Sequence, residues 1–221
     1  FPSRIASLGG GAGFENTYSL SFDGVDDNVS LTSVSAGIVS TVSFWIKRDD
    51  PDGNSEVPLG EDSYSSDYLV YLQDSGDAYK AYIRIGSVYA GYSANMNDTN
   101  WHHLAFTRNG DSISLYKDGD LVSTSAGFGT SVNTAFDTIG SKPAGTVVLL
   151  GKIDEVAIFD AVVTVGDLRD GTKPADLTGM SNLQGWWRFE EGSGTSAIDS
   201  STNSNAGTFA SEPAYSTDVP S

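Results

Sequence analysis

Three carboxylates crowd a short segment of the sequence: Asp23, Asp26 and Asp27 lie close together around Gly24. Proteins bind calcium with about six to eight hard oxygen ligands, which carboxylates, backbone carbonyls and water supply together. The segment therefore predicts a calcium site, with Asp23 and Asp26 among its ligands. An ordinary turn is the alternative, because an Asp side chain also hydrogen-bonds to nearby backbone and so favours Asp-Gly turns.

Aromatic side chains gather further along the chain, between residues 64 and 92. Sugars are held by aromatic rings that stack on their apolar faces and by polar groups that bind their hydroxyls. Tyrosines on paired strands would form such a platform, although tyrosine is also an ordinary strand residue on an antiparallel face. Trp45 and Trp186 fall at polar-phase positions of their segments, which predicts that they are exposed. The candidate ligand-binding residues are Tyr64, Tyr68, Tyr82, Tyr89, Tyr92 and Trp186.

The same residues argue against an enzyme. His102 and His103 are adjacent, so in a strand they point to opposite faces and cannot hold one metal together. No Gly-x-Ser-x-Gly segment provides a serine nucleophile. Glycoside hydrolysis needs two carboxyl groups about 5 to 9.5 Å apart across a cleft. The adjacent pairs 154–155 and 190–191 are expected to face opposite sides of their strands, so we predict a non-catalytic protein.

Charge and composition exclude several further classes of protein. The 29 acidic and 12 basic residues give a net charge of −17, which argues against binding to nucleic acid or to an anionic membrane. There is no cysteine, and hence no disulfide scaffold, thiolate zinc site or cysteine nucleophile. The longest apolar runs are far shorter than the roughly 20 residues of a membrane helix.

The elements that must position these residues are strands. In residues 18–22 and 42–46 apolar and polar residues alternate, which is the period of a half-buried strand. One short helix is expected at 164–169, where Thr164 would cap the first turn with Asp167 as the partner in a capping box. Short strands spaced about 8 to 12 residues apart, with Gly and Asn/Asp turns between them, predict an all-β fold. We expect a two-sheet antiparallel jelly-roll sandwich.

The chain has room for one such domain. We place it at residues 14–210, a length that buries roughly 70% of the unfolded surface without disulfides. Residues 1–13 are rich in glycine and read as an extended arm or linker. Residues 211–221 read as a C-terminal tail.

Four motifs resemble those of laminin-G-like domains of the concanavalin A-like jelly-roll type, and they occur in that family's order. The resemblance covers residues 18–170. The motifs are a Phe-Asp-Gly segment at 19–29, a Trp-His-His strand at 101–106, a Tyr-x-Asp-Gly hairpin at 115–119 and a closing Gly-x-Ile-Asp-Glu-Val strand at 151–159.

A fifth motif departs from that order. Residues 185–195 resemble the family's usual first strand, which normally precedes the Phe-Asp-Gly segment. Either a second, truncated repeat begins near residue 183, or the domain is circularly permuted and residues 182–210 supply its closing strand and loop. Trp187 and Phe189 share one face, and an unpaired strand so apolar would risk aggregation. We therefore favour closure of the same sandwich.

The resemblance implies a recognition module that binds a carbohydrate or a cell-surface partner outside the cell. Family members often hold a structural calcium between the Phe-Asp-Gly turn and the closing strand, which adds Asp154 to Asp23 and Asp26 as a ligand. The alternative is an architectural role on a virion surface, as a bacteriophage capsid decoration or tail component. In the first case the partner is a glycan or surface protein. In the second, the jelly roll and its termini bind copies of the chain or other virion subunits.

Overall fold

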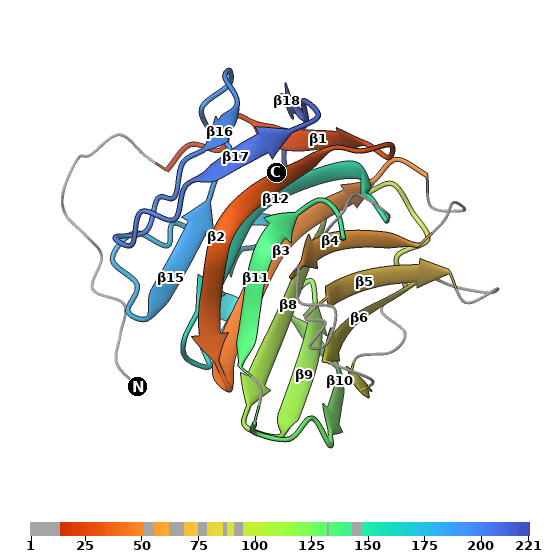
Figure 1. The fold of residues 1–221 in the computed structure, drawn as a ribbon, viewed down its shortest axis with the longest axis vertical. Coiled ribbons are helices and arrows are strands. Elements are labelled where there is room, and N and C mark those ends of the chain that lie inside the picture. The colour runs from red at the N-terminus through yellow and green to blue at the C-terminus, as the bar shows by residue number, and fades with distance from the viewer. Residues whose placement is uncertain are drawn as a thin grey trace.

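The computed structural model describes residues 14–50, 55–61, 69–74, 79–85, 88–90, 95–131, 133–142 and 147–221. Within them the chain forms two large antiparallel sheets that pack face to face (Figure 1). The predicted all-β sandwich is confirmed. The predicted N-terminal arm, residues 1–13, lies outside the described residues. In the described part, no helix has the length and apolar character that crossing a membrane requires.

The first sheet is built around β12. The first half of β12 pairs with β1, its second half pairs with β15, and β3 runs along its other edge. The strand order is β10-β9-β8-β3-β12-β1-β18. The bounds of these strands are β1 Ser19–Asp23, β3 Val39–Arg48, β8 His102–Asn109, β9 Ser112–Lys117, β10 Asp120–Ala126, β12 Leu150–Phe159, β15 Leu183–Trp187 and β18 Ala214–Ser216.

The second sheet lies across the first, with β2 and β11 near its centre (Figure 1). Its strand order is β16-β17-β2-β11-β4-β5-β6-β7. The bounds are β2 Asn28–Gly37, β4 Glu56–Gly60, β5 Leu69–Asp74, β6 Tyr79–Ile85, β7 Val88–Ala90, β11 Thr134–Ile139, β16 Ser196–Ala197 and β17 Gly207–Ala210.

The main core fills the space between the two sheets. Phe22 of β1, Phe44 of β3 and Trp187 of β15 share this core with Phe136 of β11, and all four are almost fully buried. Burying one large apolar side chain contributes about 1.5 to 3 kcal/mol. The alternation that marked residues 18–22 and 42–46 as strands is thus the alternation between this core and the outer face.

A second, smaller core lies on the outer face of the first sheet. Ala157 and Phe159 belong to it, whereas Val156 and Ile158, which alternate with them along β12, face the main core. Residues 160–182, here called the covering layer, pack on this outer face through Val165, Leu168 and Leu177. The layer contains the 3₁₀ helix η2 (Val165–Asp167) and the two-stranded hairpin of β13 (Arg169–Asp170) and β14 (Lys173–Pro174).

The expected capped helix at 164–169 is wrong in length and in its cap. Only Val165–Asp167 are helical, and Thr164 makes no side-chain cap hydrogen bond. The pattern that suggested a helix instead places Val165 and Leu168 on the outer face of the first sheet. Packing of these two side chains, rather than a capping box, holds the turn.

The C-terminal segment joins both sheets. β15 pairs with β12, so Trp186 lies opposite Ala157 in the first sheet. β17 pairs with β2 in the second sheet, and β18, within the segment expected to be a tail, pairs with β1. Residues 183–216 therefore supply strands to the same sandwich that residues 19–159 form.

Candidate functional site

The turn after β1 gathers the first group of carboxylates. Among the described residues, Asp23, Asp26 and Asp27 are the one group of acidic or His side chains dense enough to hold a metal ion, with oxygens within 4.8 Å of one another. Backbone N–H groups already bind two of them: Val25 donates to Asp23 Oδ1 at 2.8 Å, and Asp23 donates to Asp27 Oδ2 at 3.0 Å. Burial raises the pKa of Asp27, and the neighbouring carboxylates add to the effect.

Asp154 is not part of this group. In the β1–β12 register Asp23 lies opposite Leu150, so Asp154 is four residues further along β12, at about 13 Å for a strand rise of roughly 3.3 Å. The structure brings Asp23 and Asp26 together and places Asp154 elsewhere. There Asn16 Nδ2 donates a 3.0 Å hydrogen bond to Asp154 Oδ2.

A β-bulge changes the expected geometry of Asp154 and Glu155. The register between β12 and β3 shifts after Asp154, and Glu155 has a left-handed φ of 50°. The expectation that neighbouring side chains face opposite sides is wrong here: Asp154 lies opposite Trp45 on the outer face, and Glu155 accepts from Trp186 on that same face. Burial, and then the Glu155 carboxylate, raises the pKa of Asp154. Burial also raises the pKa of Glu155, against the opposing effect of Arg188.

Trp186 and Trp45 are not exposed. Each has about 2% of its surface accessible, so the predicted exposure of both residues is wrong. Trp186 donates through Nε1 to Glu155, and its ring stacks against Phe14 with the centroids 6.2 Å apart. Trp45 packs on the His103 ring. The period-two pattern placed both tryptophans on the outer face correctly, but it could not show that this face is covered.

The tyrosine platform stays a prediction. Tyr64, Tyr68 and Tyr92 lie outside the described residues. The backbone of Tyr82 pairs with Tyr71 across β5 and β6, and that of Tyr89 pairs with Arg84, but the side chains of Tyr82 and Tyr89 also fall outside the description.

The two histidines have different environments. His102 lies between two carboxylates, with Nδ1 2.7 Å from Asp118 Oδ2 and Nε2 3.0 Å from Asp98 Oδ1. Burial opposes the charged ring, but the two carboxylates outweigh it and raise the pKa of His102. His103 is fully buried and its Nε2 lies 2.8 Å from Ser43 Oγ. Burial lowers its pKa to about 3, so the ring is neutral.

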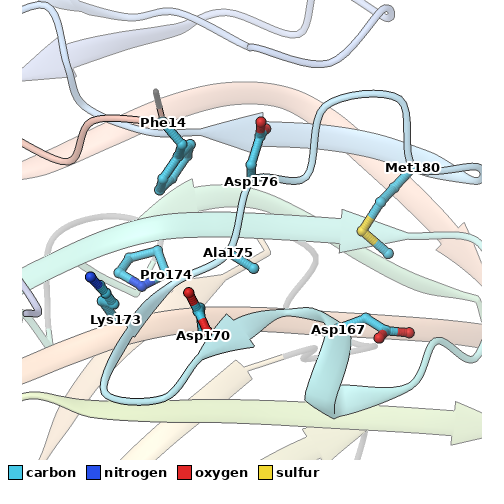
Figure 2. A pocket seen from close by; sticks show the side chains of 8 residues that line it. All are labelled: Phe14, Asp167, Asp170, Lys173, Pro174, Ala175, Asp176 and Met180. Atoms are coloured by element: carbon cyan, nitrogen blue, oxygen red, sulfur yellow. The ribbon is translucent and has the colours of Figure 1, made fainter. Parts of the chain in front are cut away.

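A cavity of about 520 Å³ opens on the covering layer. Figure 2 shows its lining, which comes from the N-terminal segment, η2, the β13–β14 hairpin and the loop that follows. The walls combine apolar side chains with three exposed carboxylates and one lysine. Hydrogen bonds from the hydroxyl and the backbone N–H of Thr178 lower the pKa of Asp176. The lining residues are Phe14, Asp167, Asp170, Lys173, Pro174, Ala175, Asp176 and Met180.

Contacts beneath the cavity fix the position of Phe14. The Arg188 guanidinium lies 4.4 Å from the centre of the Phe14 ring and donates through Nε to Glu155 Oε1 at 3.2 Å. Thr17 and Tyr18 donate their backbone N–H groups to Glu190. Sequence reasoning missed this cavity because its residues come from two separate segments, one directly after the predicted arm and one that begins in the predicted helix at 164–169. The one available signal was the cluster of Asp residues and a Lys-Pro pair at 167–176.

This fold and its motifs match a known family. The laminin-G-type model of the concanavalin A-like lectin/glucanases superfamily matches residues 23–169, which is more than half of the chain. The chain belongs to this superfamily. The superfamily's name covers lectins and glucanases alike, so catalysis has to be argued from the site. No curated protein has a significantly matching sequence.

Solved structures agree on the fold. A protein from Bacteroides ovatus ATCC 8483, described as carbohydrate binding, superposes with a TM-score of 0.72 and 16% identity, covering 94% of this chain and 62% of that one. This chain thus spans less than two thirds of that protein. A heptameric SAP-like pentraxin from Limulus polyphemus gives a TM-score of 0.60 at 13% identity, covering 87% and 95%. The LG1-3 region of the laminin α2 chain gives 0.51 at 16%, covering 65% and 27%. Identities this low show a shared fold alone.

Proposed function

We propose that the chain is an extracellular recognition module that binds a carbohydrate in the cavity on its covering layer. The observation that carries this proposal is the pairing of a fixed aromatic ring, Phe14, with the carboxylates of Asp170 and Asp176 around one cavity. Aromatic rings stack on the apolar faces of sugars, and ionised carboxylates accept hydrogen bonds from sugar hydroxyls. The superfamily's lectin members and the carbohydrate-binding structural neighbour support the same class of ligand.

Charge narrows the class of glycan. Three carboxylates and one lysine leave the cavity net negative, and the whole chain carries −17. Anionic sugars such as uronic or sialic acids are repelled by this field. Neutral sugars are therefore the expected ligands.

The proposal does not include catalysis. A glycosidase needs one carboxylic acid whose pKa is raised so that it can protonate the leaving group. In the cavity Asp176 has a lowered pKa, and hydrogen bonds from Thr178 hold it ionised. The acids with strongly raised pKa values, Glu56, Asp154 and Glu155, are buried and line neither this cavity nor the two smaller ones beside it.

We also propose that the Asp23–Asp27 turn binds a structural calcium ion. Three carboxylates within 4.8 Å of one another repel, and the raised pKa of Asp27 reflects that repulsion together with burial. A divalent cation relieves it, and carboxylate oxygens are the ligands calcium prefers. Asp23 and Asp26 would hold the ion from the exposed side of the turn, where it would pin β1 to β2.

Contacts of the C-terminal residues favour recognition over the architectural role. A subunit that assembles through its terminal segments needs those segments free to contact a neighbouring subunit. Here Asp218 accepts from Lys47 Nζ at 2.7 Å and from Trp101 Nε1 at 3.0 Å, and its carbonyl accepts from Ser19 Oγ. These contacts hold the segment on its own first sheet.

A glycan array tests the proposal. The array carries neutral and anionic glycans. It is probed with the wild-type chain, Asp170→Asn and Asp120→Asn, each in calcium and in chelator. Asp120 is an exposed acid of β10, outside the cavity, and serves as the matched control. We expect neutral glycans to bind wild type and the control, and to bind Asp170→Asn at least about tenfold more weakly. An array blank for wild type, or a loss no greater in Asp170→Asn than in the control, would contradict the proposal. Loss of binding in chelator would support the calcium site.

A further inference from the structure

Two smaller cavities adjoin the one in Figure 2, and they share lining residues with it. One, of about 230 Å³, shares Phe14, Lys173 and Pro174 with it, and the other, of about 470 Å³, shares Met180. We infer that the three cavities are consecutive parts of one groove, here called the outer groove, that binds an uncharged linear oligosaccharide. This inference rests on the proposed function and adds the length and charge of the ligand.

The cavity beyond Met180 has the chemistry of a neutral site. It lies between residues 178–184 and 200–203, and of the residues that line it none is ionisable. The wall offers no charged side chain that could pair with an ionised ligand, although the chain has 29 acidic residues. Such a wall therefore selects against charged ligands. Hydroxyls and amides both donate and accept hydrogen bonds, as the hydroxyls of a sugar do. Five of the residues that line this cavity have side chains without a hydrogen-bond partner in the described part of the chain: Ser181, Asn182, Gln184, Ser200 and Thr202.

Local contacts hold these walls in place before any ligand arrives. Asp199 accepts hydrogen bonds from the N–H groups of Trp186, Ser201 and Asn205, which fixes the wall formed by residues 200–203 against β15. Asn205 Nδ2 donates to the Gln184 carbonyl at 2.8 Å, which ties the two walls together. A pre-formed site loses less conformational entropy on binding.

The backbone of Asn182 is also constrained. Its φ of 67° lies in the left-handed region, which is uncommon outside glycine, and its carbonyl accepts from the N–H of Asp160 at 3.0 Å. Strained residues of this kind cluster at binding sites, where the surrounding structure holds them. Here the strain fixes the corner from which Ser181 and Asn182 line the cavity.

The third cavity combines apolar and polar walls. Its apolar lining comes from Phe14, Pro174, Val219 and Pro220, and Asn16, Lys173 and Ser221 add polar groups. Asn16 Oδ1 is buried and has no hydrogen-bond partner. Apolar side chains beside a few polar groups suit one sugar ring, whose carbon face packs while its hydroxyls form hydrogen bonds.

A peptide fits the outer groove less well. Extended peptides bind by pairing with the free edge of a sheet. Most of the walls are side chains of loops and terminal segments, and the regular elements that contribute are η2, the short strands β13 and β14, and the first two residues of β15. Pro174 in β14 has no N–H to offer. Peptide binding is therefore an outcome that the experiment must be able to reveal.

Calorimetric titration with oligosaccharides of increasing length tests the inference. The probes are uncharged cello-, xylo- and manno-oligosaccharides from the monosaccharide to the hexasaccharide, with oligogalacturonides as anionic counterparts. We expect affinity in the best series to rise about tenfold or more between the disaccharide and the hexasaccharide. Gln184→Ala and Thr202→Ala should remove that gain. Thr32→Ala, an exposed threonine of β2 far from the groove, is the matched control.

Each other outcome has a distinct meaning. Affinity that is independent of length and unaffected by Gln184→Ala and Thr202→Ala overturns the outer groove and leaves carbohydrate binding in the central cavity standing. Tighter binding of oligogalacturonides overturns the neutral ligand. Binding of a peptide library in place of every sugar overturns both this inference and the proposed function.

Discussion

Replacing Asp154 with asparagine tests whether Asp154 and Glu155 are a repulsive pair of buried acids. Both have raised pKa values, caused by burial, and Glu190 adds negative charge while Arg188 offsets part of it. An acid whose pKa is higher in the folded than in the unfolded state stabilises the fold at low pH. That contribution is lost as the pH rises through the folded pKa. The pair therefore stabilises the protein near pH 5 relative to pH 9.

The substitution removes one charge and can keep every hydrogen bond. The new amide oxygen accepts from the Glu155 N–H, as Asp154 Oδ1 does at 2.9 Å. The new Nδ2 donates to Asn16 Oδ1, which is buried and unpartnered, once the Asn16 amide turns over. In a chain of this length about 1 kcal/mol of unfolding free energy moves Tm by roughly 2 to 4 °C, so relief of the repulsion should raise Tm near pH 9 by at least about 2 °C.

Scanning calorimetry at both pH values, once in chelator and once in calcium, measures this. Asp154→Asn should gain stability near pH 9 and differ little from wild type near pH 5, while Asp120→Asn shows the effect of removing an exposed charge. A loss of stability at both pH values would refute the repulsion. So would a calcium-dependent rise in the Tm of wild type that Asp154→Asn lacks, because Asp154 would then be a metal ligand whose charge is needed.

Three further predictions follow from single sites. Chelator should lower the Tm of wild type, since an ion at about 100 times its Kd adds about 2.7 kcal/mol; Asp26→Asn should remove that dependence. The raised pKa of His102 means that its ion pairs stabilise the fold at low pH and that this is lost as the pH rises through the folded pKa; an NMR titration that puts the pKa at or below the ordinary 6.5 would contradict this. Gly140→Ala should cost several times more unfolding free energy than Gly37→Ala in denaturant melts. Both glycines have left-handed φ, a conformation that costs alanine about 1 to 2 kcal/mol. Of the two, only Gly140 has a neighbour that an added Cβ would meet, the Phe22 side chain at 2.0 Å.

The sandwich could be predicted from the sequence because its signal is local. Alternation within residues 18–22 and 42–46 is a property of a few neighbours, and the Asn109-Gly110 pair marks the end of β8 before β9. Such patterns report which residues face the core. Predictions of burial from such patterns are correct where one face of a strand is apolar, which is the case for β1 and β3.

The errors came where tertiary packing overrides the local pattern. Trp186 alternates correctly, but the covering layer and Phe14, distant in sequence, bury it. At Asp154 and Glu155 a bulge breaks the period of two, and no residue type in that segment announces it. The outer groove has little local signal beyond the Asp residues and the Lys-Pro pair at 167–176, because residues far apart in the sequence form its walls.

The division between scaffold and site follows the limits of the family match. Of the residues that line the outer groove, only Asp167 lies within 23–169, and all the others precede or follow that range. The matched range supplies the strands on which the covering layer packs, including Ala157 and Phe159 of β12. Those strands are constrained by two cores at once, one on each face, so a change there disturbs packing on both sides. The part of the covering layer beyond residue 169 packs through the second core alone, and its other face is free to take the residues a ligand requires.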